Sequence, residues 1–424
     1  MSADSTVALA EMAARYERPD WVRRLNLMGE SVGGAEHIVP LDADELLERA
    51  TASLGVGEYS DLGDPEWLER FRALTELLAG FGFHVVGRLI TRQELLRALR
   101  TRLLLSRAFD ADPGIEKEKV EAPVIVTGPA RSGTTILYEL LWLDPSLRAP
   151  LAGEALHPIP FPDPFPGAVT GADDPRVSMA ECEQELWADV QPEFAAMHEL
   201  RSDLPVECVT LTAPSFCGPH WGMIAPGPVP LDPATDYAFH RRILQALQRG
   251  REKRSWLLKT PAHLALLPLV FQNYPDAWVV QTHRDPARTM PSTVSTVAMI
   301  RWLRTDEVDV ASLPASIEGA FGGTLNAVAE QRKTGVLPNR FVDVHFQSLL
   351  ADPAGSVEQA YERMQREFTS EHAERIRTYL AEKPRDKFGV HKYRAADWGF
   401  DAEALRGRLS PYIDHFGVTL EKDA

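Results

Sequence analysis

The sequence predicts an α/β fold in which a parallel sheet lies between two layers of helices. Residues 124–126 form a short, wholly apolar run, which is typical of a strand covered on both faces. Similar runs recur later and are separated by helical stretches, a pattern that favours parallel strands joined by crossover helices. The first run also leads directly into a glycine-containing loop at 128–135 and an apolar helix at 136–142.

Residues 1–120 are predicted to form a helical cap that precedes the sheet. Asp42 with Glu45, and Thr91 with Glu94, have the spacing of a capping box, in which two side chains satisfy free amides at a helix start. Asp64 stands before a proline, as an N-cap does. Leucines recur at helical spacing between positions 95 and 104, so that helix is expected to bury one face.

Residues 121–424 are predicted to form the domain that contains the sheet. Further strands are expected at 255–258, 278–282 and 341–346. The segment 158–230 is rich in proline, aromatic residues and methionine, with one predicted helix at 178–187. Two interpretations of this segment remain open: it shapes the pocket for an acceptor, or it is an irregular excursion packed on the core.

Composition limits the partners of the protein. The chain has 45 basic and 61 acidic residues, a net charge of −16, so no general affinity for nucleic acid is expected. The uncharged stretch 208–231 contains five prolines, which a membrane-spanning helix would not tolerate, so no membrane span is predicted. The oligomeric state stays open, a homo-oligomer included.

The cysteines and the N-terminus indicate a cytoplasmic protein. Cys182, Cys208 and Cys217 are odd in number and lack a repeated CxxC spacing, which argues against both a disulfide framework and a zinc site. Charged residues between positions 11 and 18 interrupt the apolar stretch that a secretory signal needs.

The loop after the first strand has the features of a phosphate site. Gly128 and Gly133 permit a tight turn that points backbone N–H groups and a helix N-terminus at one place. Thr134 stands where a nucleoside-triphosphate loop requires lysine, which disfavours a phosphotransferase of the kinase or ATPase type. Arg131 is the cation of this loop and can direct two donors onto phosphate or sulfate oxygens. A merely structural turn is the alternative.

The motif at 129–135 resembles the 5'-phosphosulfate loop of nucleotide-dependent sulfotransferases. Arg284 and, eight residues later, Ser292 are similar to the pair that binds the donor's 3'-phosphate in that family. The stretches 257–264, 282–286 and 388–394 look like its bacterial, actinobacterial branch. The chain departs from the animal cytosolic branch, because Arg131 replaces a catalytic lysine and the C-terminal Arg-Lys-Gly signature is missing.

The resemblance implies a sulfotransferase that uses 3'-phosphoadenosine 5'-phosphosulfate as co-substrate, with no metal, and a small molecule with a hydroxyl group as acceptor. Lys259 is expected beside the bridging oxygen, although it could instead bind a carboxylate under the sheet edge. For Arg284 the alternative is a surface ion pair with Asp285. The expected donor-binding residues are Arg131, Ser132, Gly133, Thr134, Thr135, Arg284, Ser292, Lys392, Tyr393 and Arg394.

An alcohol acceptor needs a general base within hydrogen-bond reach. Two candidates remain open. Glu154 resembles the glutamate that serves as base in other sulfotransferase branches, and His263 lies close to the position of the catalytic histidine of the cytosolic branch. We prefer Glu154 slightly. The expected catalytic residues are therefore Glu154, His263, Lys259 and Arg131.

Other functions remain in competition with sulfuryl transfer. A phosphotransferase built on the same strand, loop and helix would bind ATP with Mg²⁺. A sulfotransferase-like binding protein would have lost its chemistry, and an enzyme that sulfonates its substrate to trigger elimination would share the same motifs. The apolar composition of 158–230 and of the cap favours a lipid, sterol, polyketide or phenol as acceptor.

Overall fold

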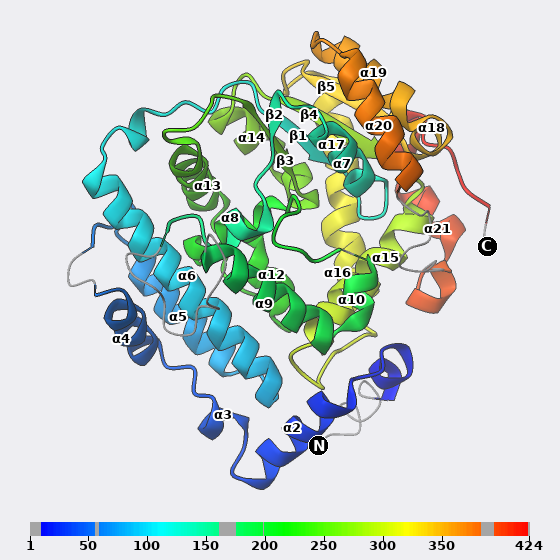
Figure 1. Cartoon of the computed structure of the whole chain (residues 1–424). Helices are drawn as coiled ribbons and strands as arrows, with labels where there is room; N and C mark the ends of the chain where they lie inside the picture. Colours follow the sequence, from blue (N-terminus) through cyan, green and yellow to red (C-terminus); the bar gives the residue numbers. More distant parts are fainter. Residues whose placement is uncertain (1–9, 56–58, 161–174, 198, 383–393, 423–424) are drawn as a thin grey trace. The chain divides into compact units, whose positions relative to one another are not determined.

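The computed structural model describes residues 10–55, 59–160, 175–197, 199–382 and 394–422 (Figure 1). The chain forms two compact units, and each is assembled from three stretches of sequence. The first unit comprises Met1–Lys119, Leu151–Glu252 and Val297–Val310, and the second comprises Val120–Pro150, Lys253–Thr296 and Ala311–Ala424. The division into a cap at 1–120 and a domain at 121–424 stays a prediction.

The second unit contains the predicted parallel sheet, which confirms the α/β fold. Its strands follow the order β2-β3-β1-β4-β5, and every neighbouring pair is parallel. Four of the strands lie where the apolar runs predicted them, whereas the short β2 was not predicted. The strand bounds are β1 Val124–Thr127, β2 Leu147–Arg148, β3 Ser255–Lys259, β4 Trp278–His283 and β5 Phe341–His345.

Helices cover both faces of this sheet, as the three-layer prediction requires. Val126 and Val344 belong to one buried cluster with residues of α7 (Thr134–Trp142) and α19 (Pro353–Met364). On the opposite face Phe341 contacts Phe271 of α14 (Leu267–Asn273), with ring centroids 5.5 Å apart. The other elements of this unit are η3 Pro261–Leu266, α16 Leu313–Ile317, η4 Glu318–Gly322, α17 Gly323–Thr334, α18 Phe346–Ala351, α20 Ser370–Glu382, η5 Ala395–Trp398, α21 Ala402–Arg408 and α22 Ser410–Phe416. Helix α15 Pro286–Trp302 begins in this unit, and its residues from Val297 onward belong to the first unit.

The strand order brings three predicted site segments to one edge of the sheet. β1 lies between β3 and β4, and its Val126 is level with Lys259 on one side and Val280 on the other. The loop after β1, the end of β3 and Arg284 after β4 therefore lie at the carboxyl ends of adjacent parallel strands. Ligands of open α/β sheets bind at such edges.

The first unit is helical over its described residues. Its main core is rich in aromatic side chains, among them Trp67, Phe71, Phe216 and Trp221. Its elements are α2 Asp20–Ser31, α3 Ala35–Ile38, α4 Ala43–Leu54, α5 Trp67–Ala79, α6 Val85–Ala111, η1 Ile115–Lys117, α8 Ala152–Leu156, α9 Pro175–Val190, α10 Pro192–Met197, α11 Cys208–Thr212, η2 Ala213–Ser215, α12 Pro219–Ile224 and α13 Pro233–Gln248.

One predicted helix start in this unit is confirmed and another is wrong. Asp42 caps α4, because its carboxylate accepts a hydrogen bond of 2.8 Å from the backbone N–H of Glu45. Thr91 and Glu94 begin no helix and instead lie inside α6, where the Thr91 hydroxyl donates to the Gly87 carbonyl.

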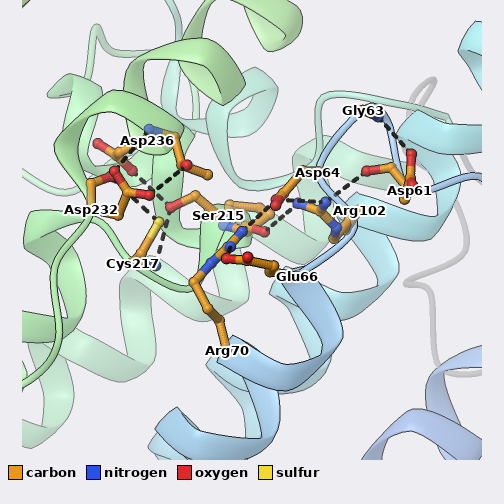
Figure 2. Close-up of polar contacts among 12 residues, drawn as sticks. Asp61, Gly63, Asp64, Glu66, Arg70, Arg102, Ser215, Cys217, Asp232 and Asp236 are labelled. Atoms are coloured by element: carbon orange, nitrogen blue, oxygen red, sulfur yellow. Dashed lines mark hydrogen bonds and ion pairs between the residues drawn. The ribbon is translucent and has the colours of Figure 1, made fainter.

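The predicted cap at Asp64 is also wrong, because α5 begins three residues later, at Trp67. The Asp64 carboxylate is bound by two arginines: Arg102 donates to it over 3.0 Å, and Arg70 forms a second ion pair (Figure 2). Arg102 is buried, so a carboxylate partner is needed to offset its desolvation.

The segment 158–230 is more helical than its sequence predicts. The expected helix at 178–187 is present as the longer α9, and three further short elements, α11, η2 and α12, follow between Cys208 and Ile224. Among the described residues, no helix combines the length and the apolar character that crossing a membrane requires.

Candidate active site

The loop after β1 requires glycine at its first position. Gly128 has φ 146°, and a Cβ atom there would lie 2.2 Å from the Thr282 hydroxyl and 2.7 Å from the Thr282 carbonyl. Any other residue would therefore clash with β4 and strain the backbone. The loop is thus held directly against the neighbouring strand.

The loop ends at a helix N-terminus that no side chain caps. Gly133 occupies the N-cap position of α7 with φ 93° and, as a glycine, makes no side-chain hydrogen bond to the amides of the first turn. Thr134 and Thr135 are the first helical residues. Such a terminus presents N–H donors and a positive dipole end, which suits an anionic group. Arg131 is exposed in the same loop and has a left-handed backbone, with φ 61°.

Ser132 faces the sheet rather than solvent. Its side chain is fully buried, and its hydroxyl donates to the Pro129 carbonyl over 2.5 Å and lies 2.5 Å from the Thr282 hydroxyl. The Ser132 hydroxyl therefore stabilises the turn. Only the backbone of Ser132 lies along the loop.

Lys259 reaches the start of α7 from the end of β3. Its ammonium group donates to the Thr135 hydroxyl over 3.3 Å, although the residue as a whole is only 3% exposed. Sequence reasoning placed both residues in the donor site, and the structure brings them together. The ammonium group is thus next to the N-terminus of the helix that follows the loop.

Arg284 lies directly after β4 and is tied to the loop. It donates to the Arg131 carbonyl over 2.6 Å, and its guanidinium stacks on the Phe346 ring, 3.7 Å from the centroid. Asp285, which the sequence offered as a partner of Arg284, pairs with Arg406 at 2.7 Å. The ion-pair partner of Arg284 is Glu421, through contacts of 2.6 and 3.0 Å.

Glu421 and Arg288 are site residues that the sequence analysis missed. Arg288, on the first turn of α15, lies 3.6 Å from the Glu421 carboxylate. No local signal indicates this contact, because Glu421 stands 137 residues after Arg284 in the chain.

Ser292 is buried in α15 with an unused hydroxyl group. It is 0% exposed, and no described residue forms a hydrogen bond with its Oγ. A buried hydroxyl without a partner is costly. An oxyanion that accepted a hydrogen bond from it would remove that cost, so the position fits the predicted contact with the donor's 3'-phosphate.

A second network fixes the end of β4 from the opposite side. The buried His283 ring contacts Asp343 at 2.9 Å and the Tyr412 hydroxyl at 3.2 Å, and Arg332 binds Asp343 through two donors. Burial alone would raise the pKa of Asp343, but His283 and Arg332 hold it below its usual range. This network orients the residue immediately before Arg284.

The two candidate bases lie in different units and different surroundings. Glu154 is on α8 of the first unit; its side chain is 18% exposed and lies 3.7 Å from Arg251. Backbone bonds from Ala152 and Gly153 to the carbonyls of Leu204 and Ser202 anchor α8. His263 is in η3 of the second unit and is buried, with 3% exposure.

The predicted C-terminal part of the donor site falls largely outside the described residues. Lys392 and Tyr393 are among the residues that the structure does not describe. Arg394 is described and forms an exposed ion pair with Asp397 at 3.0 Å.

The part of the chain that the structure describes contains no candidate metal site. No group of three or more histidine, cysteine, aspartate or glutamate side chains there could hold a metal ion.

Comparison with known proteins identifies similar chains. Residues 123–370, more than half of the sequence, match the model of the Sulfotransferase family. Two solved structures are similar at 26% identity: sulfotransferase STF9 from Mycobacterium avium, with a TM-score of 0.76 over 90% of this chain and 98% of that one, and STF1 from Mycobacterium tuberculosis H37Rv, with 0.68 over 87% and 98%. The omega-hydroxy-beta-dihydromenaquinone-9 sulfotransferase Stf3 of Mycobacterium bovis is 23% identical over 62% of this chain and 67% of its own length.

Proposed function

Because the chain belongs to the sulfotransferase family, we propose that it transfers a sulfuryl group from 3'-phosphoadenosine 5'-phosphosulfate to a hydroxyl group of an apolar small molecule. The observation that carries the proposal is the meeting of three segments at one sheet edge. The loop after β1, Lys259 at the end of β3 and Arg284 after β4 supply backbone donors and cations at adjacent strand ends.

The donor would be held at two points. The N–H groups at the start of α7, with Arg131 and Lys259, would bind the 5'-phosphosulfate. Arg284 and the unused hydroxyl of Ser292 would bind the 3'-phosphate. Two clamps fix the nucleotide along its length, which places the sulfur atom in a defined position relative to the acceptor.

The reaction forms a bond between the acceptor oxygen and sulfur while the bond from sulfur to the bridging phosphate oxygen breaks. Adenosine 3',5'-bisphosphate leaves with the electron pair of that bond. Lys259 would stabilise the negative charge that develops on the leaving oxygen, and a general base would take the acceptor's hydroxyl proton. We assign the base to Glu154, which is partly exposed, in preference to the buried His263.

The acceptor class follows from two kinds of support. The first unit is rich in aromatic side chains, and the name of the Mycobacterium relative describes a hydroxylated menaquinone as its substrate. We therefore propose a hydroxyl group on a largely apolar acceptor. We also propose a cytoplasmic location, supported by the three cysteines, none of which forms a disulfide in the described structure.

Calorimetric titration with adenosine 3',5'-bisphosphate tests the donor site. The protein is expected to bind this nucleotide, and Arg284→Ala is expected to lose about a hundredfold in affinity, because a charged donor to the 3'-phosphate is removed. Arg375→Ala is the matched control: this exposed arginine pairs with Glu371 on α20, so its loss is expected to leave the affinity unchanged.

The same titration with ATP and Mg²⁺ separates the two nucleotide chemistries. Binding of ATP without binding of the bisphosphate would contradict the proposal and favour a phosphotransferase. Binding of the bisphosphate without turnover of any hydroxylated acceptor would favour the binding protein instead.

A further inference from the structure

The carboxylate of Glu421 occupies the arginines of the 3'-phosphate clamp. It accepts hydrogen bonds of 2.6 Å from Nε and 3.0 Å from a terminal nitrogen of Arg284. Its second oxygen lies 3.6 Å from Nε of Arg288. The Glu421 side chain is only 14% exposed, so these ion pairs are partly shielded from water and stronger than surface pairs.

The backbone of Glu421 is fixed independently of its side chain. Its N–H donates to the Asp285 carboxylate over 2.8 Å, and its carbonyl accepts from Arg406 over 2.7 Å. Arg406 in turn pairs with the fully buried Asp285. The carboxylate can therefore leave the arginines by rotation of its side chain while the backbone stays in place.

A 3'-phosphate and Glu421 would compete for the same guanidinium. Glu421 uses two of the nitrogens of Arg284, and the third donates to the Arg131 carbonyl over 2.6 Å. A phosphate dianion placed beside the carboxylate would also repel it. Strong binding of the phosphate to Arg284 thus requires that Glu421 gives up at least part of its contacts.

We propose that Glu421 competes with the 3'-phosphate for the donor site: its carboxylate occupies an anion site formed by Arg284 and Arg288, and a nucleotide that carries a 3'-phosphate displaces it. The inference rests on the proposed function. Arg288 thereby becomes a further ligand of the 3'-phosphate. It stands four residues before Ser292 on α15, so the two lie on the same face of that helix.

Displacement affects only one class of nucleotide. A ligand without a 3'-phosphate, such as adenosine 5'-phosphate, offers nothing that replaces the carboxylate, so Glu421 stays bound while that ligand occupies the loop after β1. Removal of the negative charge at position 421 should therefore change the affinity for the bisphosphate and leave the affinity for the monophosphate unaltered.

The test measures both affinities by calorimetry in the full chain and in Glu421→Gln. We expect the variant to bind adenosine 3',5'-bisphosphate roughly tenfold more tightly, since it loses a charge-assisted ion pair that competes with the ligand. Its affinity for adenosine 5'-phosphate should be unchanged. Glu371→Gln, which removes an exposed glutamate paired with Arg375, is the control of equal charge and should change neither affinity.

A second variant, Glu421→Ala, removes the side-chain amide that could still form a hydrogen bond in Glu421→Gln. It should also bind the bisphosphate more tightly than the unaltered protein does. Thermal unfolding of each variant shows whether it is folded. Weaker or unchanged binding of the bisphosphate in both folded variants would overturn the inference, because Glu421 would then orient Arg284 or play no part. If the unaltered protein binds no bisphosphate, the proposed function itself fails.

Discussion

Glu154 and His263 differ in what surrounds each side chain. The Glu154 side chain is partly exposed and lies next to Arg251, on a short helix held by backbone bonds. His263 is buried at the start of η3, directly after the strand that carries Lys259. A base must come within hydrogen-bond reach of the acceptor, and we expect the partly exposed Glu154 to do so more readily than the buried His263.

Replacement of each residue separates these roles. Glu154→Gln is expected to lower kcat by about a hundredfold or more while the affinity for adenosine 3',5'-bisphosphate stays the same, because only proton transfer is removed. His263→Gln is expected to lower the melting temperature and to have little effect on kcat. Steady-state kinetics with a hydroxylated acceptor gives kcat, calorimetry gives the affinity, and thermal unfolding gives the melting temperature. Normal turnover of Glu154→Gln with a large loss in His263→Gln would reverse the assignment.

Single residues could be predicted where a local pattern surrounds them. Lys259 and Arg284 follow apolar runs that are readable as strands, so their places at the sheet edge were predictable, and the structure has them there. Glu421 was not predictable, because its contact depends on the fold of the intervening chain. The buried hydroxyl of Ser132 was also missed, since a sequence does not show which way a loop side chain points.

Among the elements, α6 shows how tertiary contacts override a local signal. His84 caps it, through a hydrogen bond of 2.9 Å from the Gly87 N–H to the imidazole. Glu94, expected at a helix start, is instead buried in the helix and binds Arg304 through two contacts of 2.8 Å. Although burial would raise the pKa of Glu94, Arg304 and then His220 lower it to about 2.

Glu94→Gln is expected to lower the free energy of unfolding by about 3 kcal/mol, because it leaves the fully buried Arg304 without an anionic partner. Urea unfolding at neutral pH measures the change. The exposed Glu48→Gln on α4 is the control and should have little effect. Replacement of both partners, as Glu94→Leu with Arg304→Met, should cost less than Glu94→Gln alone. An equal or larger cost for the double variant would show that the pair itself stabilises the helix.

Elements with a strong apolar period were predictable, and those fixed by distant contacts were not. The four longer strands lie where their runs predicted them, because full burial on both faces demands such runs. β2 has two residues, too few to show a pattern. The start of α5 was misplaced because Asp64 binds Arg102, a residue 38 positions away, instead of capping the helix.

At the scale of the whole molecule, one buried carboxyl links stability to pH. Asp236 of α13 is 5% exposed and accepts a hydrogen bond of 2.7 Å from Ser215 (Figure 2). Burial raises the pKa of Asp236 to about 7, despite the opposing effect of Ser215. The folded protein therefore binds this proton more tightly than the unfolded chain. Its contribution to stability is complete below about pH 4 and is lost as the pH rises to about 7.

Asp236→Asn is expected to flatten this dependence. Between pH 4 and pH 7 the contribution of Asp236 should fall by up to about 4 kcal/mol in the unaltered protein and be absent from the variant. Denaturant unfolding across this range measures it. Asp232→Asn is the contrasting variant. A hydrogen bond from Thr235 lowers the pKa of the Asp232 carboxyl group, so this group stabilises the folded protein at neutral pH and loses that contribution as the pH falls. Parallel curves for the protein and Asp236→Asn would contradict the assignment.

The excess of acidic residues makes the cations of the donor site a local exception. The chain carries a net charge of −16, yet Arg131, Lys259, Arg284 and Arg288 meet within the second unit, where an anionic nucleotide is proposed to bind. Composition argues against nucleic acid as an expected partner, but only the order of the strands explains how so few cations come to one place.

The left-handed backbone of Arg131 lowers the stability of the folded protein at a position that is proposed to take part in catalysis. A side chain in that conformation costs about 1 kcal/mol, which glycine would avoid. A library randomised at position 131 and sorted for heat resistance alone would therefore enrich glycine and discard the cation that is proposed to bind the phosphosulfate. Engineering of this enzyme for robustness should keep position 131 fixed and seek its gains elsewhere.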